Sequence, residues 1–134
     1  MTVNEAKIED IENVTAFVED ELSKIGCPMK AVVQISVAID EIFSNIVKYG
    51  YQGKPGPVTV SVEAMEDPKR AVVRFVDEGI PYNPLLNEDP DISLNAEERT
   101  IGGLGIYVVK KTMDDVRYMY ENDHNILTIE KKYN

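Results

Sequence analysis

The stretch Ile101-Gly102-Gly103-Leu104-Gly105-Ile106-Tyr107-Val108-Val109-Lys110 places three glycines within four residues, directly before an apolar helical pattern. Each glycine raises the entropic cost of ordering the chain, so a packed core has no use for three together. Glycines at the threshold of a helix let the backbone approach another group closely, and the amides of a helix N-terminus attract anions. The stretch therefore predicts a helix over about residues 103–113 whose start lies against an anionic ligand.

The length and composition of the chain bound its class. Its 134 residues, 43% of them hydrophobic, suit a single domain over residues 1–134 with an ordinary packed core. No apolar run approaches the ~20 residues that cross a bilayer, and no basic segment followed by an apolar run opens the chain. The net charge of −10 argues against nucleic acid or an anionic membrane surface as the main partner. The single cysteine, Cys27, excludes an internal disulfide and suits a reducing cytoplasm.

Two amphipathic helices are expected in the first half of the chain. Apolar residues recur at spacings of three and four over residues 8–25, and Gly26 ends that pattern. A second helix, over about residues 29–49, has so broad an apolar face that most of it must be buried.

A narrow polar stripe lies beside the apolar face of the second helix. It contains Glu41, Asn45 and Lys48, which follow one another at helical spacing. One reading is an ordinary solvated face, and the other is a functional one. A carboxylate and an amide one helical turn apart favour the functional interpretation, because so acidic a chain needs neither side chain for solubility.

Strand patterns follow the second helix. Residues 58–63 and 71–76 alternate or run apolar around a turn and predict a hairpin, and residues 1–7 allow a short edge strand. The second strand of the hairpin runs into Asp77-Glu78-Gly79. An aspartate followed two residues later by glycine is either a plain Asx-type turn or a functional turn at the end of a buried strand.

The last third of the chain begins with residues 85–101, which are rich in polar and turn-forming residues and predict a loop. After the glycine-led helix, residues 116–120 and 126–130 predict a closing hairpin with its turn at Asn122-Asp123-His124-Asn125. The only histidine, His124, is expected to be exposed in that turn, and one histidine with one cysteine assembles no metal site. The order of elements predicts an α+β fold, a two-layer sandwich of a mostly antiparallel sheet covered by three helices.

Three separated blocks of this sequence resemble the GHKL (Bergerat-type) ATP-binding fold. Residues 38–51, Ala-Ile-Asp-Glu-Ile-Phe-Ser-Asn-Ile-Val-Lys-Tyr-Gly-Tyr, look like the N box of that superfamily. Residues 76–84, Val-Asp-Glu-Gly-Ile-Pro-Tyr-Asn-Pro, look like its first glycine box, and residues 102–106 look like its second. The short chain and the form of the first two blocks are similar to one subgroup, the bacterial anti-sigma-factor serine kinases.

The resemblance implies ATP and Mg²⁺ as cofactors and a role for each matching residue. Asn45 matches the residue whose side-chain oxygen coordinates Mg²⁺, a hard cation that takes oxygen ligands. Glu41 matches the general base, which lies one helical turn away and near the same phosphates. Asp77 matches the residue that accepts a hydrogen bond from the exocyclic amino group of adenine, and Gly79 lets the backbone pass close to the ring.

Five further positions complete the nucleotide site that the resemblance implies. Gly103, Leu104 and Gly105 would present backbone amides to the phosphates. Thr128, on the last strand, would support the adenine through water. Arg99 is the only positive charge in the loop of residues 85–101, so it is proposed as a contact of the γ-phosphate, with a solvated arginine as the equal alternative.

The subgroup implies a cytoplasmic, ATP-dependent protein serine kinase and anti-sigma factor. Its members phosphorylate a STAS-domain anti-anti-sigma partner, regulate a sigma factor and are often homodimers, with no direct contact to nucleic acid or membrane. One alternative is a nucleotide-responsive binding module with little phosphotransfer, although Glu41 would be superfluous in it. Another, the detached catalytic part of a histidine kinase, needs a phosphoacceptor histidine on a dimerisation helix, and no residue ahead of the first expected helix supplies one.

Overall fold

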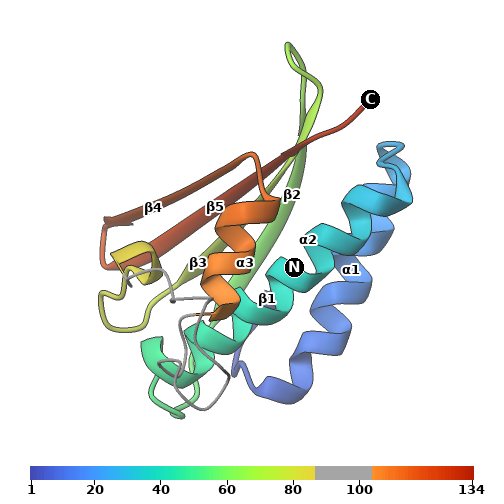
Figure 1. The fold of residues 1–134 in the computed structure, drawn as a ribbon. Coiled ribbons are helices and arrows are strands. Elements are labelled where there is room, and N and C mark those ends of the chain that lie inside the picture. The colour runs from blue at the N-terminus through green and yellow to red at the C-terminus, as the bar shows by residue number, and fades with distance from the viewer. Residues whose placement is uncertain (87–103) are drawn as a thin grey trace.

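The computed structural model describes residues 1–86 and 104–134, and it confirms the expected α+β architecture. Three α-helices of the described chain form one layer and a five-stranded sheet forms the other (Figure 1). The helices are α1 (Ile11–Lys24), α2 (Met29–Asn45) and α3 (Leu104–Thr112). The strands are β1 (Thr2–Val3), β2 (Val58–Met65), β3 (Arg70–Asp77), β4 (Asp115–Glu121) and β5 (His124–Lys132).

The sheet is antiparallel at every junction and has the order β1-β2-β3-β5-β4. Both expected hairpins are present, and β1 pairs with the edge of β2 as a short additional strand. The hairpins join through β3 and β5, a pairing that the sequence patterns left open. Its register sets Asp77, the last residue of β3, opposite Asn125, near the start of β5.

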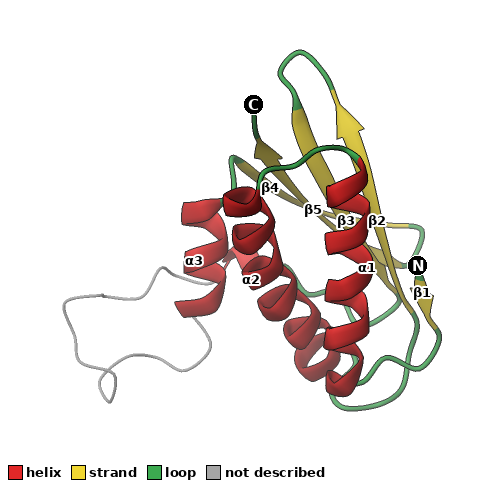
Figure 2. Ribbon diagram, turned by 90° about the vertical axis from the view of Figure 1, so that its right-hand side faces the viewer, coloured by secondary structure: helices red, strands yellow, loops and turns green. Residues whose placement is uncertain are grey.

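The hydrophobic core lies between the helices and one face of the sheet. Figure 2 shows α3, α2 and α1 side by side on that face. The expected helical stripes point inward: Val14, Val18 and Leu22 of α1 and Ile39 of α2 have no exposed surface. They meet sheet residues such as Phe75, which is equally inaccessible. Each such side chain contributes about 1.5–3 kcal/mol through burial, and together these residues form the core that joins the helices to the sheet.

The end of α2 differs from the sequence prediction of a regular helix to Tyr49. The α-helix ends at Asn45, and the next turn, Ile46–Gly50, is a wider π-helical turn. Its closing bond runs from Tyr51 N–H to the carbonyl of Ile46, 2.9 Å away. Ile46 remains buried throughout, so the apolar pattern continues unchanged while the backbone widens. The wider turn brings the backbone of Gly50 to the end of β3.

The turn between β4 and β5 is shorter than predicted. Asn122 and Asp123 alone form the loop, with φ angles of 53° and 62°. Positive φ at both central residues is the signature of a type I′ hairpin turn, which asparagine and aspartate tolerate. His124 and Asn125 are therefore the first residues of β5 rather than part of the turn, and His124 is only partly exposed.

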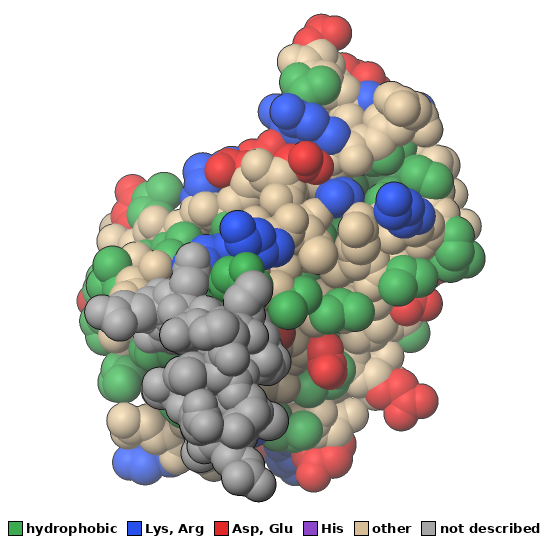
Figure 3. Space-filling model, viewed as in Figure 1, with side chains coloured by type: hydrophobic (Ala, Val, Ile, Leu, Met, Phe, Trp, Pro, Cys, Tyr) green, Lys and Arg blue, Asp and Glu red, His purple; other side chains and the backbone are tan. Residues whose placement is uncertain are grey.

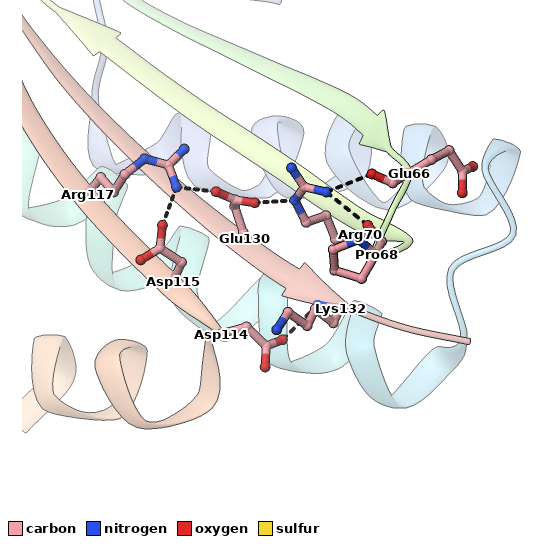
Figure 4. Close-up of polar contacts among 8 residues, drawn as sticks. All are labelled: Glu66, Pro68, Arg70, Asp114, Asp115, Arg117, Glu130 and Lys132. Carbon is pink, nitrogen blue, oxygen red and sulfur yellow. Dashed lines mark hydrogen bonds and ion pairs between the residues drawn. The ribbon is translucent and has the colours of Figure 1, made fainter.

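The sheet face away from the helices carries a row of charged side chains across three strands (Figure 4). Glu130 of β5 lies between Arg70 of β3, whose Nε is 2.5 Å from its Oε1, and Arg117 of β4. Arg117 also pairs with Asp115. The Arg117 guanidinium is the main group that lowers the pKa of the Glu130 carboxyl, and Arg70 lowers it as well. Burial acts in the opposite direction, but the net effect is a pKa below the usual value. This row ties the two hairpins together on the face opposite α1, α2 and α3.

The surface of the helix-bearing side is mixed. Figure 3 shows acidic and basic side chains interspersed there with exposed hydrophobic ones. Within residues 1–86 and 104–134, no helix has the length and apolar character needed to cross a membrane.

Candidate functional site

A pocket opens where the end of α2, the end of β3 and the start of β5 meet. Its walls are mainly apolar, and three buried polar side chains, Asn45, Asp77 and Asn125, project among them. The lining residues are Ile42, Asn45, Ile46, Gly50, Asp77, Tyr82, Pro84, Tyr118, Asn125 and Leu127. An apolar pocket with a few convergent polar groups is the usual form of a small-molecule site.

Asp77 is the acidic group of this pocket. Only 5% of its surface is exposed. Its Oδ1 accepts hydrogen bonds from Gly79 N–H and from Asn125 Nδ2, both at 2.9 Å. Burial raises the pKa of the Asp77 carboxyl, and these two bonds partly offset that rise. Because both bonds fall on Oδ1, a ligand donor can approach the carboxylate at Oδ2.

The turn after Asp77 is held from the far side by the segment that follows α2. Ile80 N–H donates to the carbonyl of Gly50 at 3.0 Å, and Glu78 N–H donates to the hydroxyl oxygen of Tyr51 at 2.7 Å. A Cβ on Gly79 would lie 2.6 Å from the Gly50 carbonyl oxygen. Gly79 is thus needed for the close approach of two protein segments, a reason that the sequence did not indicate.

Glu41 and Asn45 continue the site along α2. Asn45 lines the pocket, 6% exposed, and Glu41 lies one helical turn before it and is partly exposed. A Cβ on Gly105, at the start of α3, would lie 2.0 Å from the Glu41 carboxyl carbon. The beginning of α3 therefore lies directly against the Glu41 carboxylate.

Asn45 has the properties expected of a ligand for Mg²⁺. Its Nδ2 is buried and, within the part of the chain that the structure describes, has no hydrogen-bond partner. A buried amide left unpaired costs about 1–3 kcal/mol, and a 180° rotation would turn Oδ1 to the same place. The described residues contain no cluster of three histidine, cysteine or carboxylate side chains that could hold a metal alone. Magnesium commonly takes one or two protein oxygens and completes its shell with water and substrate phosphates, so Asn45 fits.

The other predicted site residues have mixed outcomes. Arg99 and Gly103 lie outside the described residues. Leu104 begins α3, and Gly105 follows it against Glu41. Thr128 is not brought to the pocket: its neighbours in β5, Leu127 and Ile129, face the core, so strand alternation turns Thr128 to the opposite face of the sheet.

The β5 residue at the pocket is Asn125 rather than Thr128, the residue that was expected to support the adenine through water. Asn125 was missed because a four-residue turn was expected over residues 122–125, which would have left it at the surface. The Asn122-Asp123 pair was the available signal, since two residues that tolerate positive φ can complete a type I′ turn alone. With that turn, Asn125 becomes an inward-facing strand residue.

Comparison with known proteins agrees with these features. A family model described as histidine kinase-like ATPase domain matches residues 4–131. The serine-protein kinase RsbW of Listeria monocytogenes is 29% identical over 116 residues, which cover 83% of this chain and 71% of that protein. The protein of the same name from Bacillus mycoides is 25% identical over 126 residues, covering 91% and 78%.

One solved structure supports the fold alone. A chain in the crystal structure of the SiaB–SiaC complex from Pseudomonas aeruginosa superposes with a TM-score of 0.60 at 14% sequence identity. The match covers 99% of this chain and 89% of that one.

Proposed function

This chain belongs to the histidine kinase-like ATPase domain family, and from that premise we propose that it is an ATP-dependent protein serine kinase. Its substrate is a serine of a STAS-domain anti-anti-sigma protein, and through that partner it regulates a sigma factor in the cytoplasm. The observation that carries the proposal is the pocket shared by Asp77 and Asn45, with Glu41 one helical turn before Asn45 and in contact with Gly105. The similarity to proteins named serine-protein kinase RsbW supports the choice of acceptor.

The nucleotide lies in the site with its base toward Asp77. The exocyclic amino group of adenine donates to Asp77 Oδ2, and the apolar walls, including Ile42 and Leu127, bury the ring. The triphosphate extends past Asn45 toward the N-terminus of α3, where backbone amides attract phosphate oxygens. Asn45 Oδ1 would hold Mg²⁺ beside the phosphates, and the ion would supply the positive charge that so acidic a chain needs there.

Glu41 performs the proton transfer. As the serine hydroxyl attacks the γ-phosphorus, a new O–P bond forms to serine and the bond to the β-phosphate oxygen breaks, releasing ADP. Glu41 accepts the proton that the hydroxyl loses, and this requires the carboxylate to lie within hydrogen-bond reach of the serine. Its place one turn from Asn45 and beneath Gly105 supports this role.

The experiment is transfer of labelled phosphate from Mg-ATP to a cognate STAS-domain protein. We expect one phosphoserine on the partner and an equal amount of ADP. If the nucleotide binds and the partner binds but no phosphate moves, the kinase proposal fails and the chain is a nucleotide-responsive binding module. If Mg-ATP and Mg-ADP at millimolar concentration leave the melting temperature unchanged, the nucleotide site itself is wrong.

A further inference from the structure

Asn125 is the most highly connected polar side chain at the pocket. It is 4% exposed at the second position of β5. Its amide nitrogen donates to Asp77 Oδ1 at 2.9 Å, to the carbonyl of Ile80 at 2.9 Å and to that of Gly79 at 3.2 Å. Its amide oxygen accepts Tyr82 N–H at 3.1 Å and the hydroxyl of Tyr118.

These bonds determine how the amide is turned. A rotated amide would set its NH₂ against the Tyr82 N–H, a donor against a donor, and its oxygen against two backbone carbonyls and a carboxylate. The observed orientation also uses both N–H groups and both oxygen lone pairs. No capacity remains for a direct bond to a ligand, so Asn125 can act on one only through Asp77.

We propose that Asn125 is the positioning residue for the nucleobase acceptor: it holds Asp77 Oδ1 and thereby aims Oδ2 at the pocket. The proposal rests on the proposed function, since it assumes that Asp77 accepts a hydrogen bond from the base. An aspartate without this support would rotate within the pocket and would gain a proton more readily. Asn125 thereby keeps the pocket a hydrogen-bond acceptor, which selects a base with an exocyclic amino group.

The groups around Asp77 determine how the loss of Asn125 would change the pKa of the Asp77 carboxyl. Burial raises the pKa of the Asp77 carboxyl, while Asn125, Gly79 N–H and the nearby His124 lower it. Tyr51 and Tyr118 also face the carboxylate, and Glu78 follows it in the chain. Without the hydrogen bond from Asn125, the rise in pKa that burial causes would be less offset. The pKa of the Asp77 carboxyl would therefore be higher still, and the group would take up its proton at higher pH.

Two substitutions at this position predict opposite pH trends in the affinity for Mg-ADP, measured by calorimetry. Asn125→Leu removes the donor, so its affinity relative to wild type falls about tenfold further as the pH is lowered through the raised pKa of the Asp77 carboxyl. Asn125→Asp sets a second carboxylate beside Asp77, and such pairs share one proton. Its relative affinity therefore improves over the same range. The phosphates of ADP titrate identically in all samples, so the ratio to wild type isolates the protein.

Thr128→Val is the matched control, a buried polar residue three positions along β5 that faces the other side of the sheet. It should stay within about twofold of wild type at every pH. A purely structural role of Asn125 would lower affinity by one factor at all pH values, and that result overturns the proposal. Absence of Mg-ADP binding by wild type would instead refute the proposed function.

If the Asn125 variants do not fold, a measurement on the wild-type protein still tests the proposal. The side-chain amide protons of Asn125, observed by NMR, should exchange slowly, and their chemical shifts should follow the protonation of Asp77. Shifts that stay constant while the Asp77 carboxyl carbon titrates would also overturn the proposal.

Discussion

Gly105→Ala separates the catalytic role of Glu41 from the stability of the fold. The added Cβ would lie 2.0 Å from the Glu41 carboxyl carbon and from Oε2, whereas ordinary contact begins at 3.4 Å. The carboxylate must therefore retreat by about 1.4 Å, the difference between these two distances. A displacement of about 1 Å at a reacting group costs about 100-fold in rate. We expect phosphotransfer to fall by about that factor.

The same substitution should leave folding and binding intact. Alanine is about 1 kcal/mol better than glycine inside a helix, and Gly105 lies in α3, so the melting temperature should stay level or rise by a few degrees. The backbone N–H is retained, so the affinity for Mg-ADP should change by less than about threefold. The assays are the initial rate of transfer to the partner, calorimetric titration of Mg-ADP, and thermal unfolding.

A double-mutant cycle tests whether the effect passes through Glu41. If Gly105→Ala acts by displacing that carboxylate, it should have little further effect in a Glu41→Ala background. Additive losses in the double variant would refute this reasoning, as would a single Gly105→Ala variant that transfers phosphate at the wild-type rate.

Three further predictions concern single side chains. Glu41→Ala should lower phosphotransfer by orders of magnitude and keep nucleotide affinity within a few-fold; a collapse of affinity in calorimetry would make Glu41 structural. Asp77→Asn, nearly identical in shape, should weaken Mg-ADP binding at least about tenfold, and unchanged affinity would exclude Asp77 as the base acceptor. Arg117 and Arg70 hold the pKa of Glu130 below its usual value, so the stability that this ionised side chain confers is full above about pH 5 and is lost as the pH falls through the lowered pKa. Glu130→Gln should therefore cost about 1–2 kcal/mol of unfolding free energy near neutral pH and much less at pH values below the lowered pKa of Glu130, and a pH-independent cost in denaturant titrations would contradict this explanation.

The helices and hairpins could be predicted from sequence because burial imposes a period. The apolar stripe of α1 and the alternating apolar residues of β2 each form one buried face. Such a pattern can be recognised from the local sequence alone. The order of the strands could not be predicted in this way. The junction of β3 with β5 depends on which hairpin edges meet beneath α2 and α3, and nothing in either strand encodes its partner.

The candidate site was predictable where a residue type has a distinct chemical role and not where backbone geometry decides. Asn45, Glu41 and Asp77 stood out as polar groups at the edges of apolar patterns. The π-helical turn after Asn45 left no trace in the pattern, because Ile46 is buried in either geometry. The place of Asn125 depends on a two-residue turn in place of a four-residue one, and this difference of register moves the side chain from the surface to the pocket.

The most direct test of the proposed kinase is intact-mass analysis of a cognate STAS-domain protein after incubation with this chain and Mg-ATP. We predict a gain of one phosphoryl group on a single serine of the partner, with stoichiometric ADP, and no gain with Glu41→Ala. An unmodified partner, under conditions where wild type demonstrably binds both Mg-ATP and that partner, would contradict it.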